Sequence, residues 1–172
     1  VRRRRNDIEF DVHVTPWQVF GDAAGLSRAV LNLLDNAAKW SPSGGQVGLR
    51  LTQVDSSHAE LVVSDHGPGI PPQERRLVFE RFYRSTAARA MPGSGLGLAI
   101  VKQVVLKHGG ALRVDDTVPG GQPPGTSIFL LLPGRPGAPV SFPARSAGVG
   151  DNEDAVTEEQ NSSAEQSVIS VD

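Results

Sequence analysis

Three short blocks rich in asparagine or glycine follow one another along this chain of 172 residues. They are residues 32–39 (NLLDNAAK), residues 65–70 (DHGPGI) and residues 93–98 (GSGLGL). Each block alone is common in proteins. Their fixed order, with apolar segments between them, indicates a fold that assembles one site from distant segments.

Apolar periodicity predicts the elements that carry these blocks. Alternation predicts strands at residues 8–14, 17–20, 47–51, 59–63, 112–114 and 127–132. Helical spacing predicts a helix from Asp22, the expected N-cap, to about residue 41, and others at residues 71–82 and 98–108. Residues 85–95 lack an apolar period and are expected to form a mobile loop. The sequence therefore predicts an α/β two-layer sandwich, with a mixed, mostly antiparallel sheet and about three helices on one face.

The composition changes near residue 133. Residues 1–133 contain 15 lysines and arginines against 12 acidic residues, whereas residues 134–172 contain 2 arginines against 7 acidic residues. The second segment is also rich in glycine, proline and serine and has little to bury. We expect a linker end at residues 1–7, one folded domain at residues 8–133 and a disordered C-terminal tail at residues 134–172.

Several classes of protein are disfavoured. The chain has no cysteine, which excludes disulfides and thiolate metal sites, and its four histidines lack metal-ligand spacing. Neither charge balance favours nucleic acid as a partner. No segment is long and apolar enough to span a membrane, and no signal peptide is visible, so the chain is expected to be soluble. The abrupt start at Val1 suggests a fragment of a longer protein, which could itself be a membrane protein.

The first block supplies a polar helix face. Asn32, Asn36 and Lys39 are spaced four and three residues apart, so they share one side of the predicted helix, away from its apolar stripe. An amide oxygen suits Mg²⁺, which prefers hard oxygen ligands, and a lysine can meet a phosphate oxygen as a point charge. A solvated helix face explains the same spacing, and the block alone favours that alternative.

The second block places an acid at the end of a predicted strand. Asp65 can accept a hydrogen bond from an exocyclic amine, and Gly67 and Gly69 let a flat ring approach the backbone. A simple turn between a strand and a helix explains these residues equally well.

The third block precedes a predicted helix. Backbone amides freed by Gly93, Gly95 and Gly97, directed from a helix N-terminus, can bind phosphate. The dinucleotide-binding fingerprint does not fit, because its third glycine comes one place early and Leu98 stands where that glycine belongs. No P-loop pattern occurs in the chain.

Taken together, the blocks resemble the catalytic, ATP-binding domain of bacterial sensor histidine kinases, which belong to the GHKL superfamily and have the Bergerat fold. The resemblance comprises an asparagine box, two glycine boxes, a phenylalanine box at residues 79–83 (FERFY) and a final Gly-Thr at residues 125–126. It covers roughly residues 8–132.

The resemblance implies ATP and Mg²⁺ as cofactors. It implies that Asn36 coordinates Mg²⁺ bridging the phosphates, with Asn32 and Lys39 supporting the phosphates. It also implies that Asp65 reads the adenine amine, with Thr126 beside it. The other implied nucleotide contacts are Gly67, Gly69 and Trp40 at the base and Arg81, Arg84, Gly93, Gly95, Gly97 and Leu98 around a lid. Trp40 stands where the family usually has tyrosine, and it can also stack on the base.

Two departures narrow the function. Related gyrase, Hsp90 and MutL ATPases have a water-activating glutamate four residues before the metal-binding asparagine, where this chain has Asn32. Without that carboxylate base, transfer to another nucleophile is favoured over hydrolysis. In addition, no histidine here has the phosphoacceptor context of the family, a histidine followed by an acid and then a proline.

We therefore expect the catalytic half of a two-component sensor kinase, which transfers the γ-phosphate of ATP to a histidine on a dimerisation domain absent from this chain. The expected partners are that dimerisation and histidine phosphotransfer domain and a cognate response regulator, with no nucleic acid. The isolated domain is expected to be a monomer, the parent kinase a homodimer, and the location the cytoplasmic side of a plasma-membrane sensor. The alternatives are a stand-alone GHKL ATPase, a serine kinase directed at a partner and, less well matched, a non-enzymatic interaction domain.

Overall fold

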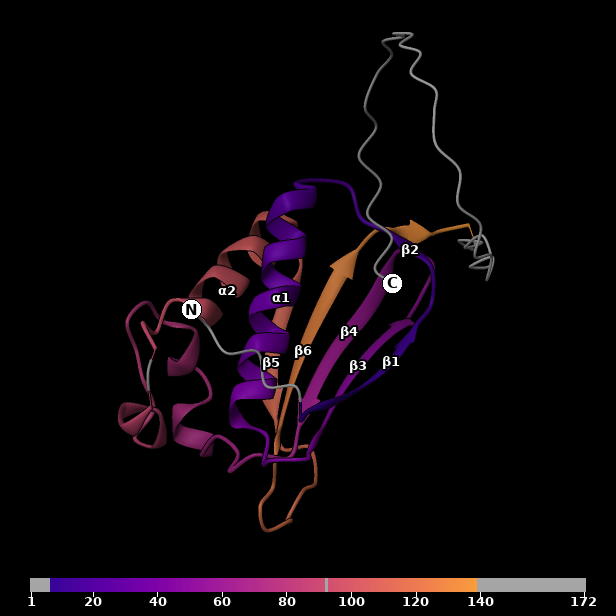
Figure 1. The fold of residues 1–172 in the computed structure, drawn as a ribbon. Coiled ribbons are helices and arrows are strands. Elements are labelled where there is room, and N and C mark those ends of the chain that lie inside the picture. Colours follow the sequence, from indigo (N-terminus) through magenta and orange to yellow (C-terminus); the bar gives the residue numbers. More distant parts are fainter. Residues whose placement is uncertain (1–6, 92, 139–172) are drawn as a thin grey trace, which may run out of the picture.

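The computed structural model describes residues 7–91 and 93–138. Within these residues, five strands form one sheet in the order β1-β3-β4-β6-β5 (Figure 1). The strands are β1 (Glu9–Val14), β3 (Gln46–Gln53), β4 (His58–Asp65), β5 (Ala111–Asp115) and β6 (Thr126–Pro133). Only β1 and β3 pair in parallel; the other neighbours are antiparallel. The predicted mixed, mostly antiparallel sheet is confirmed.

Two α-helices, α1 (Ala23–Trp40) and α2 (Gly97–Lys107), lie side by side over one face of this sheet (Figure 1). Asp22 is the N-cap of α1, as predicted, because its side chain accepts a hydrogen bond from the amide of Gly25 at 3.0 Å. Helix α1 ends before Ser41. The next residue, Pro42, has no backbone N–H and therefore cannot donate to the helical hydrogen-bond ladder.

The helix predicted at residues 71–82 does not form as one unit. It is replaced by two short 3₁₀ helices, η1 (Pro72–Glu74) and η2 (Leu77–Phe79), and a third, η3 (Ala87–Ala90), lies in the region predicted to be loop. Within η1 and η2 only Val78 and Phe79 are buried. A longer helix would have little apolar face to pack, and short helices depend on such packing.

The core lies between the helices and the sheet. Its fully buried side chains are large and aliphatic and come from both layers: Leu33, Val47, Leu61, Val101, Val105 and Leu130. Each contributes about 1.5–3 kcal/mol through burial. This packing fixes the end of β4 relative to both helices, which matters because the three sequence blocks lie on these elements.

A second, two-stranded sheet pairs β2 (Trp17–Gln18) with β7 (Arg135–Pro136). Trp17 is buried, and a Cβ on Gly134 would lie 2.5 Å from its ring nitrogen, so Gly134 packs directly on the indole. The tail predicted from residue 134 therefore begins too early, because its first residues pair with β2 and cover Trp17. Residues 139–172 of that predicted tail, and residues 1–6 of the predicted linker, lie outside the described residues.

Among the described residues, no helix combines the length and the apolar character needed to cross a bilayer.

Candidate functional site

Asp65 and Thr126 are paired neighbours at one end of the sheet. Asp65 is the last residue of β4 and Thr126 the first of β6, and their backbones are in register. Both are buried, with 3% and 6% of their surface exposed. The Asp65 Oδ1 atom accepts a hydrogen bond from the amide of Gly67 at 2.8 Å. The structure therefore places Asp65, the residue predicted to bind the adenine amine, beside Thr126, its predicted neighbour.

Burial raises the pKa of the Asp65 carboxyl to about 6, against the hydrogen bonds from the Gly67 and Thr126 amides, which lower it. Desolvation disfavours the charged form, and the two amide donors offset only part of that effect. At neutral pH the group is mainly a carboxylate, a strong acceptor for an amine donor. A buried carboxyl with a perturbed pKa is a common sign of a functional site.

The glycines after Asp65 allow three segments to meet. A Cβ on Gly67 would lie 2.6 Å from the carbonyl oxygen of Trp40, at the end of α1. Gly69 has a φ of +80°, and a Cβ there would lie 2.5 Å from Pro124. The space into which a side chain would project from either glycine is thus occupied by other atoms of the protein. These glycines are needed for packing around Asp65 whether or not they also line a base site.

The first and third blocks also meet. Asn32, Asn36 and Lys39 lie on a half-buried face of α1. A Cβ on Gly97, the first residue of α2, would lie 3.9 Å from the Asn32 side-chain oxygen, and one on Gly93 would lie 3.1 Å from the Lys39 amine. The start of α2 therefore faces the polar side of α1. Together with Asp65, this brings parts of all three blocks to the same part of the sandwich.

Asn32 has a buried amide nitrogen, Nδ2, that finds no hydrogen-bond acceptor among the described residues. Buried polar atoms without a partner are rare in folded proteins and call for an explanation. This one lies beside the N-terminus of α2, where backbone amides favour an anion. A phosphate oxygen bound there would accept hydrogen bonds from the Asn32 Nδ2 atom and from the backbone amides of α2.

Lys39 and Arg84 bring two positive charges together. Burial and, secondarily, the charge of Arg84 lower the pKa of the Lys39 amine. The Arg84 guanidinium donates to the carbonyls of Ala88 and Met91, which holds it against the segment at residues 85–95, here called the lid loop. The Lys39 amine lies 5.5 Å from the centre of the Trp40 ring. Two neighbouring cations favour an anionic ligand between or beside them.

Three other predicted residues have contacts that do not depend on a nucleotide. Arg81 is exposed and donates to Gln103 on α2 at 3.4 Å. Leu98 packs against the hydrophobic core. Gly95 has a φ of +71°, and its carbonyl accepts from the amide of Phe82 at 3.0 Å, so it fixes the end of the lid loop. The structure leaves the nucleotide roles predicted for these three residues as hypotheses.

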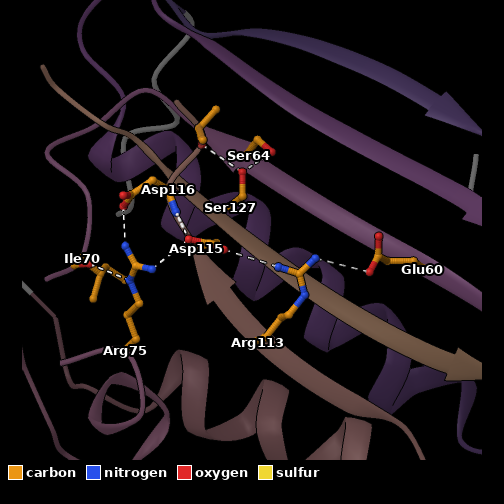
Figure 2. A network of polar contacts seen from close by, with 9 residues as sticks. Glu60, Ser64, Ile70, Arg75, Arg113, Asp115, Asp116 and Ser127 are labelled. Atoms are coloured by element: carbon orange, nitrogen blue, oxygen red, sulfur yellow. Dashed lines mark hydrogen bonds and ion pairs between the residues drawn. The ribbon is translucent and has the colours of Figure 1, made fainter. Parts of the chain in front are cut away.

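A polar network that no sequence pattern predicts lies beside Asp65. Figure 2 shows Arg75 between Ile70 on one side and Asp115 and Asp116 on the other. Next to Asp116, the Thr117 hydroxyl donates to the carbonyl oxygen of Asp65 at 2.8 Å. Thr117 and its partners Ser127 and Ser64 form a chain of hydroxyls, at 3.0 Å and 2.8 Å. Apart from the contacts of Arg75 with Ile70 and of Thr117 with Ser127, the partners are 40 or more residues apart in sequence, so no periodic pattern links them.

The described residues contain no group of three or more histidines, cysteines, aspartates or glutamates that could hold a metal ion. The oxygen donors on this face of α1 are the side-chain amides of Asn32 and Asn36, and hard oxygen ligands suit Mg²⁺ rather than a soft transition metal. Mg²⁺ commonly takes one or two protein oxygens and completes its shell with substrate phosphates and water. The amide oxygen of Asn36, on the same helix face as Asn32 and Lys39, is an oxygen donor of this kind.

Comparison with known proteins gives consistent results. A family model described as "Histidine kinase-, DNA gyrase B-, and HSP90-like ATPase" matches residues 21–136. The signal transduction histidine-protein kinase/phosphatase MprB of Mycobacterium avium (strain 104) is 71% identical over 182 aligned residues, which cover 100% of this chain and 35% of that protein. MprB of Mycobacterium sp. (strain KMS) is 84% identical over 139 residues, covering 81% of this chain and 27% of that protein. The chain thus spans about a third of the length of these curated relatives.

Two solved structures agree with the fold. The mycobacterial sensor histidine kinase MprB superposes with a TM-score of 0.74 at 75% identity, covering 78% of this chain and 87% of that chain. Full-length ShkA in complex with AMPPNP has a TM-score of 0.63 at 30% identity, covering 77% of this chain and 27% of that chain.

Proposed function

The chain belongs to the family of histidine kinase-, DNA gyrase B- and HSP90-like ATPases, and from that premise we propose that its site transfers the γ-phosphate of ATP to a histidine of a sensor kinase. The fold is that of the ATP-binding domains of histidine kinases. The observation that carries the proposal is the meeting of α1 and α2, with Gly97 beside Asn32 and Gly93 beside Lys39. It gives the site a cationic, amide-rich end, separate from the carboxylate at Asp65.

The two ends suit the two ends of ATP. Asp65 accepts a hydrogen bond from the exocyclic amine of adenine, while guanine presents a carbonyl at that position and cannot donate. Lys39 and Arg84 neutralise the triphosphate, and the amides at the start of α2 receive phosphate oxygens. The buried Nδ2 of Asn32 gains an acceptor in the same step.

Mg²⁺ would be held by the amide oxygen of Asn36 together with the phosphates. When bound, it supplies charge neutralisation at the phosphates. The protein's own contribution is to hold the triphosphate between α1 and the lid. Phosphoryl transfer depends mainly on such positioning and on stabilisation of charge.

In the proposed reaction, a histidine nitrogen of the dimerisation domain forms a bond to the γ-phosphorus as the bond to the bridging oxygen of ADP breaks. Asn32 offers no carboxylate base, so the site holds ATP without deprotonating water. The matched relatives are named histidine-protein kinase/phosphatases. We extend the kinase activity, the dimerisation domain, the homodimeric parent, the response regulator and the membrane location of a sensor to this chain as parts of the same proposal.

Calorimetry on the 172-residue chain tests the part of this proposal that concerns ATP binding. We expect Mg-ATP to bind and GTP to bind much more weakly. Removal of Mg²⁺ with a chelator should lower the affinity for ATP. Absence of ATP binding in the folded chain, verified by circular dichroism, would rule the proposal out.

A further inference from the structure

The side chain of Arg75 joins two segments that are distant in sequence. It lies between η1 and η2, and its Nε donates to the carbonyl of Ile70 at 3.1 Å. Its Nη1 contacts Asp115 at 2.8 Å and its Nη2 contacts Asp116 at 2.6 Å (Figure 2). The side chain is 21% exposed. A guanidinium presents five donors in a rigid plane and so holds these three acceptors at fixed directions, whereas a lysine ammonium is a compact charge on a flexible stem and does not fix that geometry.

The two segments that Arg75 joins, residues 65–75 and residues 115–126, both contain residues that pack around Asp65. Ile70 follows Gly69, whose backbone packs against Pro124 and the carbonyl of Gly125. On the other side, Asp116 precedes Thr117, whose hydroxyl donates to the Asp65 carbonyl at 2.8 Å. The two segments are also joined where the amide of Gly125 donates to the carbonyl of Gly67 at 3.1 Å.

We propose that Arg75 is a positioning residue for adenine recognition: by tying Ile70 to Asp115 and Asp116 it holds the two segments that fix Asp65. The inference rests on the proposed function, in which Asp65 reads the base. Arg75 itself contacts no reacting atom. It acts through Thr117 and through the backbone on either side of Asp65.

The charges explain why Arg75 is needed at this place. Asp115 and Asp116 are adjacent carboxylates, and like charges at this spacing repel. The pKa of Asp115 is lowered, first by a hydrogen bond from the Asp116 amide and then by the charge of Arg75. Without Arg75, the two carboxylates would separate or turn towards water. Thr117, the next residue, would then lose its fixed approach to Asp65.

Arg113 provides a matched control. It also approaches Asp115, at 3.7 Å, but its other partner is Glu60, at 3.8 Å, and its side chain is 55% exposed (Figure 2). Its guanidinium lies 3.4 Å from the centre of the Phe129 ring. Arg113→Gln therefore removes an arginine beside the same carboxylate while leaving the contacts to Ile70 and Asp116 in place.

The test measures ATP and GTP affinity by calorimetry for the wild-type chain, Arg75→Gln, Arg75→Lys and Arg113→Gln, with thermal melting as a check on folding. Arg75→Gln should weaken ATP by about tenfold, the equivalent of about 1.4 kcal/mol. The preference for ATP over GTP should fall as well, because the loss concerns the base and not the phosphates. Arg75→Lys should fail to restore the preference, and Arg113→Gln should stay within about twofold of wild type, as expected for an exposed pair.

Each result has a defined meaning. Wild-type ATP affinity and preference in Arg75→Gln would overturn the inference, as would an equal loss in Arg113→Gln. If Arg75→Gln does not fold, Asp116→Asn decides: it keeps the arginine but loses the charge partner at 2.6 Å, and unchanged ATP preference there would also overturn it. A wild-type chain that binds no ATP would instead refute the proposed function, so the two failures are distinguishable.

Discussion

Gly97 at the start of α2 faces Asn32 on α1, and a Cβ at Gly97 would lie 3.9 Å from the Asn32 side-chain oxygen. That distance is an ordinary van der Waals contact, so the fold itself has room for a side chain there. Gly95 is different, because its φ is +71° and a Cβ would lie 2.8 Å from the carbonyl of Tyr83. The backbone conformation therefore requires glycine at position 95, whereas at position 97 only the proposed approach of phosphate requires it.

Gly97→Ala should leave the melting temperature unchanged or slightly raised, since alanine is favoured over glycine in helices by roughly 0.5–1 kcal/mol. Gly97→Val should nevertheless weaken ATP binding, because its larger side chain obstructs the approach of phosphate to the α2 amides. Gly95→Ala should lower the melting temperature, since a non-glycine residue in this conformation is strained by about 1–2 kcal/mol. Wild-type ATP affinity in Gly97→Val, measured by calorimetry, would contradict the phosphate assignment.

Asp65→Asn should weaken ATP sharply and reduce the preference for ATP over GTP. The amide can present a donor to the adenine amine, and leaving buried polar groups unpaired costs about 1–3 kcal/mol. The matched measurement is the ratio of ATP to GTP affinity in the two proteins. Equal affinities for ATP and GTP in the wild-type chain would show that Asp65 does not read the base.

The raised pKa of Asp65 predicts a pH dependence of stability. Its folded pKa is about 6, above the unfolded value of about 3.9, so between these values the folded state binds more protons than the unfolded state. Stability should therefore fall as pH rises from about 4 to about 6 and then level off. Relative to Asp65→Asn, which lacks this group, the wild type should lose on the order of 2–3 kcal/mol over that range. Denaturant unfolding of both proteins at pH 4 and pH 7 measures the difference; a constant difference would show that the carboxyl is not perturbed.

Asn36→Ala should reduce the Mg²⁺ dependence of ATP binding. The alanine removes the proposed protein oxygen ligand and leaves Lys39 and the α2 amides to bind the phosphates. The comparison is ATP affinity with Mg²⁺ and with chelator, in wild type and in Asn36→Ala. Unchanged metal dependence would show that the ligand assignment is wrong.

The pairing of β7 with β2 predicts where the folded domain can be shortened. A chain ending at residue 138 should melt within about 2 °C of the full chain, because it keeps Gly134 on Trp17 and the β2–β7 pair. A chain ending at residue 133 exposes Trp17 and should lose several degrees, since about 1 kcal/mol corresponds to about 4 °C in a domain of this size. Equal melting temperatures for both shortened chains would show that β7 contributes nothing.

Local signals account for the parts of the fold that the sequence predicted. Asp22 capping α1 and the alternation along β3, β4 and β6 depend on neighbouring residues and a regular period. The contacts of Arg75 with Asp115 and Asp116 depend on how the whole sheet brings its ends together, and no period encodes them. The break between η1 and η2 has a similar origin, because the fold buries only Val78 and Phe79 there, which is too little apolar surface to support one longer helix. Composition places Gly134 in the predicted tail, and only its contact with Trp17 reveals its role in the folded domain.

For the site, the order of the three blocks identified which segments meet but not how they meet. The proximity of Gly93 to Lys39, and of Arg84 to the same amine, depends on the path of the lid loop. Thr117 has no sequence signal of its own, although its hydroxyl contacts the Asp65 backbone. Residues that hold a site in place are recognisable only once the fold has joined them to it.

The most direct test of the central claim is phosphate transfer between separated domains. The chain should bind radiolabelled Mg-ATP yet hardly label itself or release phosphate, because it holds the triphosphate without a positioned nucleophile. Addition of the separately prepared dimerisation domain of the parent kinase should produce label on that domain, at histidine, stable to base and labile to acid. Strong labelling of the chain alone, or rapid release of phosphate that does not depend on the added domain, would contradict the account and favour an ATPase or a self-acting kinase.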